Sequence, residues 1–173
     1  MSCASYTLTG LGVQCKDSIG GIKKAWFAPA GITKSVSANT LTIDASDISK
    51  FKVYNFRKAT GSMTSTLNTS ETAGNSFTTE VTLQFLKQET SKRVEVMALL
   101  MNEMEGVIKD GNGKYWYIGY DYPIEASAGT AETGTAMTDL NGYNLTITDN
   151  SVQLPYEITD ATTIAALEAI EVV

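Results

Sequence analysis

The chain has 173 residues, of which 43% are hydrophobic, and carries 19 Asp and Glu against 13 Lys and Arg for a formal net charge of -6. This length predicts one domain of ordinary size, and the apolar fraction argues against a disordered chain. A sequence pI of about 4.6 excludes general adhesion to nucleic-acid phosphates, because such adhesion requires positive charge. Any DNA involved is expected to pass by the protein and not to be held.

Signatures of catalysis and of metal binding are missing from the sequence. It contains no histidine, no metal-ligand spacing and no nucleophile motif. Asp110 and Asp121, or Glu103 and Glu105, could be assembled into an acid/base pair on paper, but isolated carboxylates in an acidic chain carry no weight. We therefore expect a structural building block that is not an enzyme and uses no cofactor.

No segment favours a membrane or secretion. The longest apolar stretch, Val94 to Met104, is interrupted by polar residues and is far shorter than the roughly 20 residues that a membrane span needs. The first residues lack the basic start and apolar core of a secretory signal, so assembly in a cytoplasm without membrane insertion is expected. Cys3 and Cys15 are then expected to be reduced thiols, and pairing after release from a cell stays open.

The N-terminal third predicts an arm followed by short strands. Residues 1–18 are polar and irregular, and we interpret them as an N-terminal arm. Ile19 to Phe27 predicts a first strand whose paired glycines permit a kink or bulge at its start. Leu41 to Asp44 and Phe51 to Phe56 predict two further short strands.

A long polar segment, Lys58 to Ser76, comes next. Its only large apolar residues are Met63 and Leu67, and its threonines favour an exposed ribbon with its tip near Ser70 to Asn75. A hairpin with almost no core of its own either moves freely or docks on a neighbouring subunit. The run from Phe77 to Phe85 then alternates apolar and polar residues, which is the pattern of a half-buried strand.

Residues 90–104 show the one convincing helical pattern in the sequence, and we predict a helix there. Thr90 or Ser91 can cap its start, and Gly106 can end it. Apolar residues recur at helical spacing along one face, and we favour packing of this face against a sheet over the alternative, a surface for a ligand or partner. The face comprises Val94, Met97, Ala98, Met101 and Met104.

A tight hairpin is predicted between Val107 and Tyr120, because Asp110 to Gly113 supplies two pairs of turn residues. The same residues hint at a calcium loop, but no further acidic ligand follows them, so we favour the turn. Aromatic residues of this segment could stack sugars or bases, yet the acidic balance favours one face in the core and the other at a subunit contact. These residues are Tyr115, Trp116, Tyr117, Tyr120 and Tyr122.

The last part of the chain predicts more strands and then changes in character. Ala126 to Asp139 is expected to hold a closely packed strand, and the Asn141-Gly142 turn leads into an alternating strand from Tyr143 to Thr148. Residues 159–173 are expected to form a C-terminal arm or a short helix, with Asp160 available as its cap.

Together these patterns predict a mainly β fold. The expected architecture is an antiparallel β-sandwich or barrel over residues 19–158, with one flanking α-helix at residues 90–104. A long hairpin at residues 58–76 protrudes from it, and both termini are extended.

The order of these elements resembles that of tail tube (major tail) proteins of long-tailed bacteriophages. The shared features are a kinked first strand, a long polar hairpin, an alternating strand that runs into a single helix, an Asp-Gly hairpin and a terminal strand pair. The Ala-rich C-terminal segment has no counterpart in that pattern. The matching segments are Ile19 to Phe27, Asn75 to Phe85, the helix carrying Lys92-Arg93, Lys109 to Tyr120, Thr133 to Thr148 and Leu154 to Ile158.

The resemblance implies a phage virion protein, assembled in the host cytoplasm, that packs side by side into rings, usually of six copies. The inner sheets of such rings line a channel through which genomic DNA passes without specific binding. The rings stack, and other phage tail proteins are further partners. A long loop, matched here by Lys58 to Ser76, and the two terminal arms reach into the next ring.

Contacts between subunits or rings are therefore expected on the hairpin and near the termini. A neutral or negative lumen agrees with the acidic pI, because positive charge would trap phosphates. The residues predicted for these contacts are Met63, Leu67, Thr69, Glu71, Asn75, Ile19, Ile164 and Leu167.

Two other classes of function stay open. One is a different virion component, either a capsid decoration protein or a head-to-tail or baseplate adaptor built on the same sandwich. The other is a carbohydrate-binding or ligand-binding β-sandwich module that uses the aromatic residues between Tyr115 and Tyr122.

Overall fold

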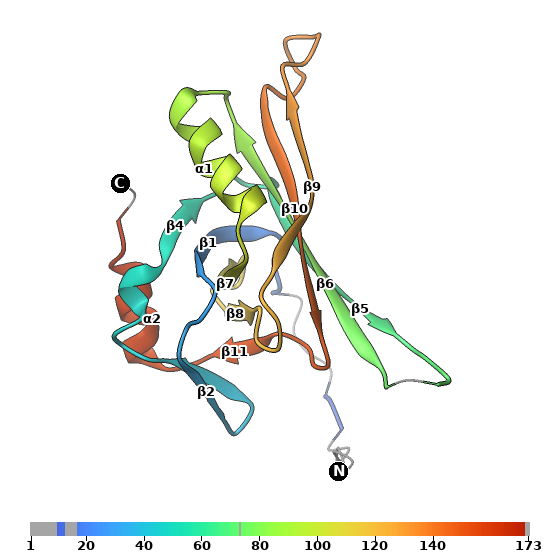
Figure 1. The fold of residues 1–173 in the computed structure, drawn as a ribbon, viewed down its shortest axis with the longest axis vertical. Helices are drawn as coiled ribbons and strands as arrows, with labels where there is room; N and C mark the ends of the chain where they lie inside the picture. The colour runs from blue at the N-terminus through green and yellow to red at the C-terminus, as the bar shows by residue number, and fades with distance from the viewer. Residues whose placement is uncertain (1–9, 13–16, 73, 172–173) are drawn as a thin grey trace.

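The computed structural model describes residues 10–12, 17–72 and 74–171. Within them, two β-sheets lie face to face and two α-helices pack beside them (Figure 1), which confirms the predicted mainly β sandwich with a flanking helix. The predicted N-terminal arm, residues 1–18, lies for the most part outside the described residues. The helices are α1 (Thr90–Met101), α2 (Ala161–Glu168) and the short 3-10 helix η1 (Ile48–Lys50).

The larger sheet has seven strands in the order β2-β3-β11-β8-β7-β1-β4. Its first strand begins at Ile22 and not at Ile19, because Gly21 adopts a positive φ of 97° and turns the chain just before it. The register between β1 and β7 shifts between Ile22 and Lys24, which is the predicted irregularity at the start of this strand. The strands are β1 (Ile22–Pro29), β2 (Lys34–Ser37), β3 (Thr40–Ile43), β4 (Lys52–Asn55), β7 (Met104–Asp110), β8 (Tyr115–Ile118) and β11 (Tyr156–Ile158).

The smaller sheet has four antiparallel strands in the order β5-β6-β10-β9. β5 and β6 form the predicted hairpin, whose far end projects from the body (Figure 1). The predicted alternation is confirmed, since Val81 and Leu83 are buried while Glu80 between the strand's buried positions is exposed. The strands are β5 (Gly61–Asn68), β6 (Ser76–Leu86), β9 (Glu125–Glu132) and β10 (Gly142–Ser151).

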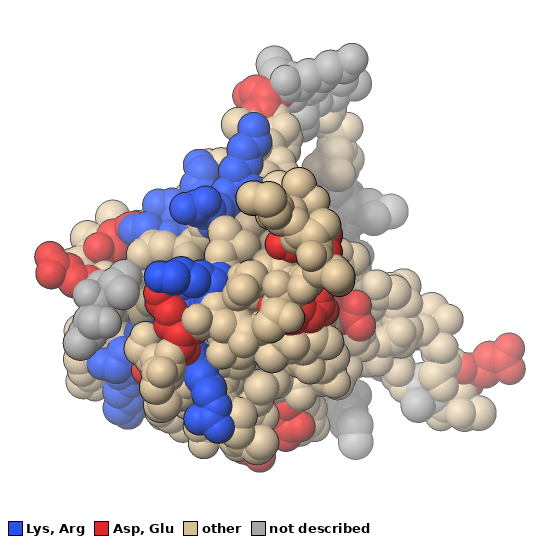
Figure 2. Space-filling model, turned by 90° about the horizontal axis from the view of Figure 1, so that it is seen from above, with Lys and Arg blue, Asp and Glu red and all other residues tan. Residues whose placement is uncertain are grey.

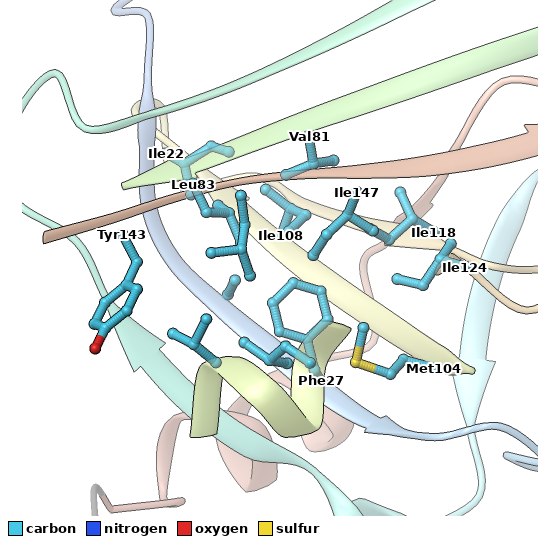
Figure 3. Close-up of a cluster of buried hydrophobic side chains, with 14 residues drawn as sticks. Ile22, Phe27, Val81, Leu83, Met104, Ile108, Ile118, Ile124, Tyr143 and Ile147 are labelled. Carbon is cyan, nitrogen blue, oxygen red and sulfur yellow. The ribbon is translucent and has the colours of Figure 1, made fainter. Parts of the chain in front are cut away.

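The first hydrophobic core lies between the two sheets (Figure 3). Val81 and Leu83 of β6 and Leu145 and Ile147 of β10 contribute to it from the smaller sheet. Because side chains along a strand alternate between two faces, these strands turn their remaining side chains to the opposite, outer side. The larger sheet contributes Ile22, Ala25, Phe27, Met104, Ile108 and Ile118.

A second core lies between the other face of the larger sheet and α2. Trp26 is completely buried there, and its indole Nε1 donates a hydrogen bond to the carbonyl oxygen of Leu167 at 2.9 Å. Asp160 caps α2 as predicted, because its carboxylate accepts a hydrogen bond from the backbone N–H of Thr163 at 2.7 Å. The C-terminal segment is thus a short helix that packs on the body.

The face that α1 buries differs from the predicted one. Val96 and Leu99 enter the first core, whereas Val94, Met97 and Met101 are 59%, 42% and 73% exposed. Two apolar stripes fit the helical period of this segment, and tertiary contacts select the stripe that meets the sheets. The prediction that this face packs in the core is therefore wrong for the residues on the helix, while Met104 is buried in the first core from β7.

The ends of α1 also differ from the prediction. The helix starts after Glu89, and no side chain caps its start, so neither Thr90 nor Ser91 acts as the cap. It ends at Met101, and the chain enters β7 at Met104. Gly106 lies inside β7, where an added Cβ would stand 2.8 Å from the ring of Phe27, so this glycine permits close packing and does not end a helix.

The hairpin of β2 and β3 was not predicted. Its turn residues Ala38 and Asn39 have positive φ angles of 49° and 63°, as the two central residues of a type I′ turn require. Alanine is an uncommon residue in such a turn, so the sequence lacks the usual signal. The turn predicted at Asp110 to Gly113 is confirmed, since Gly113 has a φ of 84° and its N–H bonds to the carbonyl of Asp110.

Replacing a buried and an exposed residue of α1 tests which face it buries. Leu99→Ala is expected to lower the free energy of unfolding by about 2–5 kcal/mol, because it leaves a cavity in the first core. Met101→Ala on the exposed face is expected to change it by about 0.5 kcal/mol or less. Urea unfolding followed by circular dichroism measures both, and equal losses would contradict this orientation of the helix.

Candidate functional site

The most distinctive surface of the molecule is the outer face of the four-stranded sheet. Neighbouring strands place residues of like character in rows, such as Thr64, Glu80, Thr148 and Glu125 across β5, β6, β10 and β9. Most of its residues carry hydroxyl, amide or carboxylate groups, and the exceptions are Ala128 and, in the end row beside Glu132, Leu86 and Gly142. From β5 to β9 they are Ser62, Thr64, Thr66, Asn68, Thr78, Glu80, Thr82, Gln84, Asn144, Thr146, Thr148, Asn150, Glu125, Ala128, Thr130 and Glu132.

The side chains of this face bond to one another across strands. The Asn68 amide donates to the Thr78 hydroxyl at 2.8 Å, and that hydroxyl donates to the Asn150 side-chain oxygen at 2.9 Å. At the other side of the sheet, the hydroxyl of Thr148 donates to that of Ser127 at 2.8 Å. These bonds connect neighbouring strands through the polar side chains of the outer face.

No positive charge lies on any strand of this sheet. Residues 59–86 and 115–173 contain no Lys or Arg at all. The charged residues of β6, β9 and β10 are therefore all carboxylates, and β5 has no charged residue. Figure 2 shows Lys and Arg side chains over the body of the molecule, whereas the part that projects to the right carries red atoms and no blue ones. A polyanion that approaches the outer face therefore meets no cation and is weakly repelled by Glu80, Glu125 and Glu132.

Both edges of this sheet are unpaired in the described part of the chain. β5 pairs only with β6, and β9 pairs only with β10, so neither edge strand has a second β-strand partner. Monomeric proteins protect such edges with lysine, proline or a covering segment. β5 and β9 contain neither lysine nor proline, so these edges remain competent to pair with another strand.

Five of the predicted contact residues lie on the projecting hairpin. Thr69, Glu71 and Asn75 are exposed around its tip, and Leu67 is 50% exposed. Met63 lies nearer the body, where it is half-buried against the first core. Sequence reasoning missed Phe77, which lies directly opposite Leu67 on β6 and is half-buried.

The other three predicted contact residues lie elsewhere. Ile19 is exposed beside the turn between β7 and β8, where its backbone N–H donates to the Asn112 side-chain oxygen at 2.7 Å. Ile164 is half-buried against the second core. Leu167 is completely buried in that core and is not available for contact with another molecule, because α2 packs on the body through this residue.

The predicted aromatic cluster is divided between interior and surface. Tyr115 and Tyr117 of β8 belong to the second core, while Trp116 between them faces the other way and is half-buried. Tyr120 is half-buried and packs edge-on against Tyr156, with ring centroids 4.9 Å apart. Tyr122, which follows β8 in the chain, is the one member of the cluster that is mostly exposed.

A buried ion pair connects β2 to β7. The Glu105 carboxylate pairs with Lys34 at 2.5 Å and accepts hydrogen bonds from the Tyr117 hydroxyl and from the backbone N–H of Gly31. Burial alone would raise the pKa of Glu105, but the bonds from Lys34, Tyr117 and Gly31 outweigh it and lower that pKa. Glu103, the other member of the acid/base pair considered above, is exposed, so the two do not face a common site.

Asp149 is a second buried carboxyl, on the inner side of β10 opposite Thr79. One of its oxygens accepts a hydrogen bond from the Gly119 N–H at 3.1 Å, and the other has no hydrogen-bond partner among the described residues. Burial raises the pKa of this carboxyl, and the nearby charge of Asp121 adds to the effect. Asp121 itself accepts a hydrogen bond from the Val152 N–H at 2.9 Å and does not face Asp110 of the β7–β8 turn.

An open groove of about 550 Å³ lies between α1 and β4. Its walls include Tyr54 of β4, Phe85 of β6 and Leu99 of α1. Lys52 and Glu95 give the rim charges of both signs, so the groove does not select for either sign of ligand.

Among residues 10–12, 17–72 and 74–171, no three acidic or cysteine side chains come together in a way that could hold a metal ion. The helices in that part of the chain are too short or too polar to cross a bilayer. No protein-family model, no curated protein and no solved structure matches the chain.

One signal in the sequence could have identified the outer face in advance. The absence of Lys and Arg from residues 59–86 and 115–173 is plain in the sequence, although only strand pairing shows that the two segments form one sheet. Sequence reasoning considered the net charge of the whole chain and missed this uneven distribution.

Removal of Lys34 tests the buried ion pair. Lys34→Met is expected to cost about 3–5 kcal/mol of unfolding free energy at pH 7, because it leaves the Glu105 carboxylate buried without its charged partner. Lys114→Met, which breaks the exposed pair with Glu157, is the matched control and is expected to cost about 0–1 kcal/mol.

The same variants are also expected to differ in how their stability changes with pH. In the original protein the lowered pKa of Glu105 contributes stability that is present above its unfolded pKa and is lost as pH falls through the folded value. Without Lys34 that pKa rises, so the deficit of Lys34→Met should shrink on acidification. Urea unfolding at several pH values measures this, and a deficit that grows on acidification would contradict it.

Proposed function

We propose that this chain is the self-assembling protomer of a bacteriophage tail tube, a virion structural protein whose stacked rings surround a channel for DNA. The observation that carries the proposal is the outer face of the four-stranded sheet, which is polar, bears carboxylates and lacks every cation. In this role the chain needs no catalytic group and no cofactor. The resemblance of its element order to tail tube proteins supports the same function.

The unpaired edges suggest how a ring would close. If β5 of one copy pairs with β9 of the next, the four-stranded sheets join into one continuous sheet, and each exposed edge is covered. The polar outer faces then all point the same way. Since the core already occupies the inner faces, the outer faces are the ones free to line a lumen, and six copies are expected from the resemblance.

The chemistry of this lining suits the passage of DNA. A surface with lysines or arginines would hold phosphates and release them only at high salt. A lining of threonine, serine and asparagine with scattered Glu80, Glu125 and Glu132 hydrates well and repels phosphates weakly. The lysines and arginines of the protein all lie outside the strands of this sheet.

Assembly of the purified protein tests the proposal directly. Negative-stain electron microscopy over a concentration series, with light scattering for mass, is expected to show tubes or stacked rings with a central channel. A monodisperse monomer at every concentration would contradict self-assembly. Closed rings that never stack would favour a decoration or adaptor protein.

Placing a positive charge on the outer face tests the role of the lining. Thr146→Lys, in the middle of β10, is expected to make assembled tubes retain a short DNA duplex at low salt, because its amine binds phosphates. Thr42→Lys, on an exposed position of β3, adds the same charge elsewhere and is the matched control. Co-sedimentation of labelled duplex with the tubes measures retention, and equal retention by the two variants would contradict a lumenal face.

A further inference from the structure

One helix carries an exposed apolar surface that the proposed lining does not explain. Val94, Met97 and Met101, which we call the α1 stripe, lie at helical spacing on one face and are all exposed. The opposite side of α1 holds Val96 and Leu99 in the first core, so the core does not cover the stripe. Three neighbouring large apolar side chains in water are typical of a contact surface.

The projecting hairpin carries a second isolated apolar surface. Leu67 and Phe77 lie directly opposite each other on β5 and β6, on the side that faces the core nearer the body. The next row inward is polar, because Ser65 and Thr79 bond to each other through their hydroxyls at 2.7 Å. This polar row separates the pair from the first core, so Leu67 and Phe77 cannot be an extension of that core.

The two apolar surfaces lie at opposite ends of the molecule. In Figure 1 the hairpin of β5 and β6 projects at the lower right, whereas α1 lies at the upper left. A single copy therefore cannot bring them together. Two copies that meet head to tail can, and a contact of this heterologous kind repeats from copy to copy.

The hairpin tip and one flank of the α1 stripe carry opposite charges. The hairpin tip carries Glu71 and no cation. The first turn of α1 carries Lys92 and Arg93, and the side chain of Arg93 is exposed next to the stripe. Opposite charges at a contact guide its register more than they add to its affinity.

We propose that the β5–β6 hairpin of one copy docks on α1 of a second copy. Leu67 and Phe77 pack against Val94, Met97 and Met101, and Glu71 approaches Arg93 of the other copy. The inference rests on the proposed function, to which it adds the receiving surface for the hairpin. It requires only that copies associate head to tail, whether or not they also close into rings.

Cysteine cross-linking tests the contact. In a background with Cys3→Ser and Cys15→Ser, the variant with both Leu67→Cys and Met97→Cys is expected to give, on mild oxidation, a ladder of covalently linked copies in a non-reducing gel. Each single variant lacks the second thiol of a head-to-tail pair and should give no ladder. Leu67→Cys with Met137→Cys is the matched control, because Met137 is an exposed methionine in the β9–β10 loop and not on α1.

Microscopy of the same samples separates this inference from the proposed function. Tubes without a ladder would overturn the docking of the hairpin on α1 and leave the tail tube proposal standing. A ladder without tubes would support the docking and contradict the tube. Neither tubes nor a ladder would contradict both, and a ladder of equal yield from the Met137 control would overturn the specific contact.

A second pair of variants gives a readout that does not depend on oxidation. Met101→Glu is expected to raise the protein concentration needed for assembly by about tenfold or more, which corresponds to about 1.4 kcal/mol, because it places a carboxylate in the contact. Met137→Glu should leave that concentration unchanged. Circular dichroism establishes that both variants are folded, and equal effects of the two substitutions would overturn the proposal.

Discussion

Packing of the four-stranded sheet on the seven-stranded sheet is the constraint on which the rest of the structure depends. Val81, Leu83, Leu145 and Ile147 are committed to the first core, and strand geometry then sends every alternate side chain outward. Core packing therefore does not constrain the residue types on the outer face. This face is mainly polar and carries no cation on any of its strands, which a fold alone does not require.

α1 illustrates how close packing decides what a helix shows to its surroundings. Leu100 lies against Gly129 of β9, where an added Cβ would stand 2.8 Å from a Leu100 methyl carbon, and Val96 and Leu99 enter the core beside it. These contacts set the rotation of the helix about its axis. The methionines at 97 and 101 face outward as a consequence, so the exposure of the α1 stripe follows from the same packing that stabilises the sandwich.

The cations and carboxylates are distributed unevenly between the two sheets. The buried carboxylate of Glu105 is paired with Lys34, and the half-buried carboxylate of Glu168 on α2 is paired with both Lys24 and Lys109. The cations that make these pairs come from the seven-stranded sheet. The strands of the four-stranded sheet carry no cation, so positive charge is confined to the rest of the molecule.

The sequence by itself determined the elements whose signals are local. Alternation identified β6, turn residues identified the hairpin at Asp110 to Gly113, and Asp160 marked the start of α2, because a period of two or a capping carboxylate acts over a few residues. Only the tertiary structure decided which face of α1 is buried, that Leu167 belongs to the core, and that residues 61–86 and 125–151 form one sheet. Those outcomes depend on contacts between residues distant in the chain, and no local pattern encodes them.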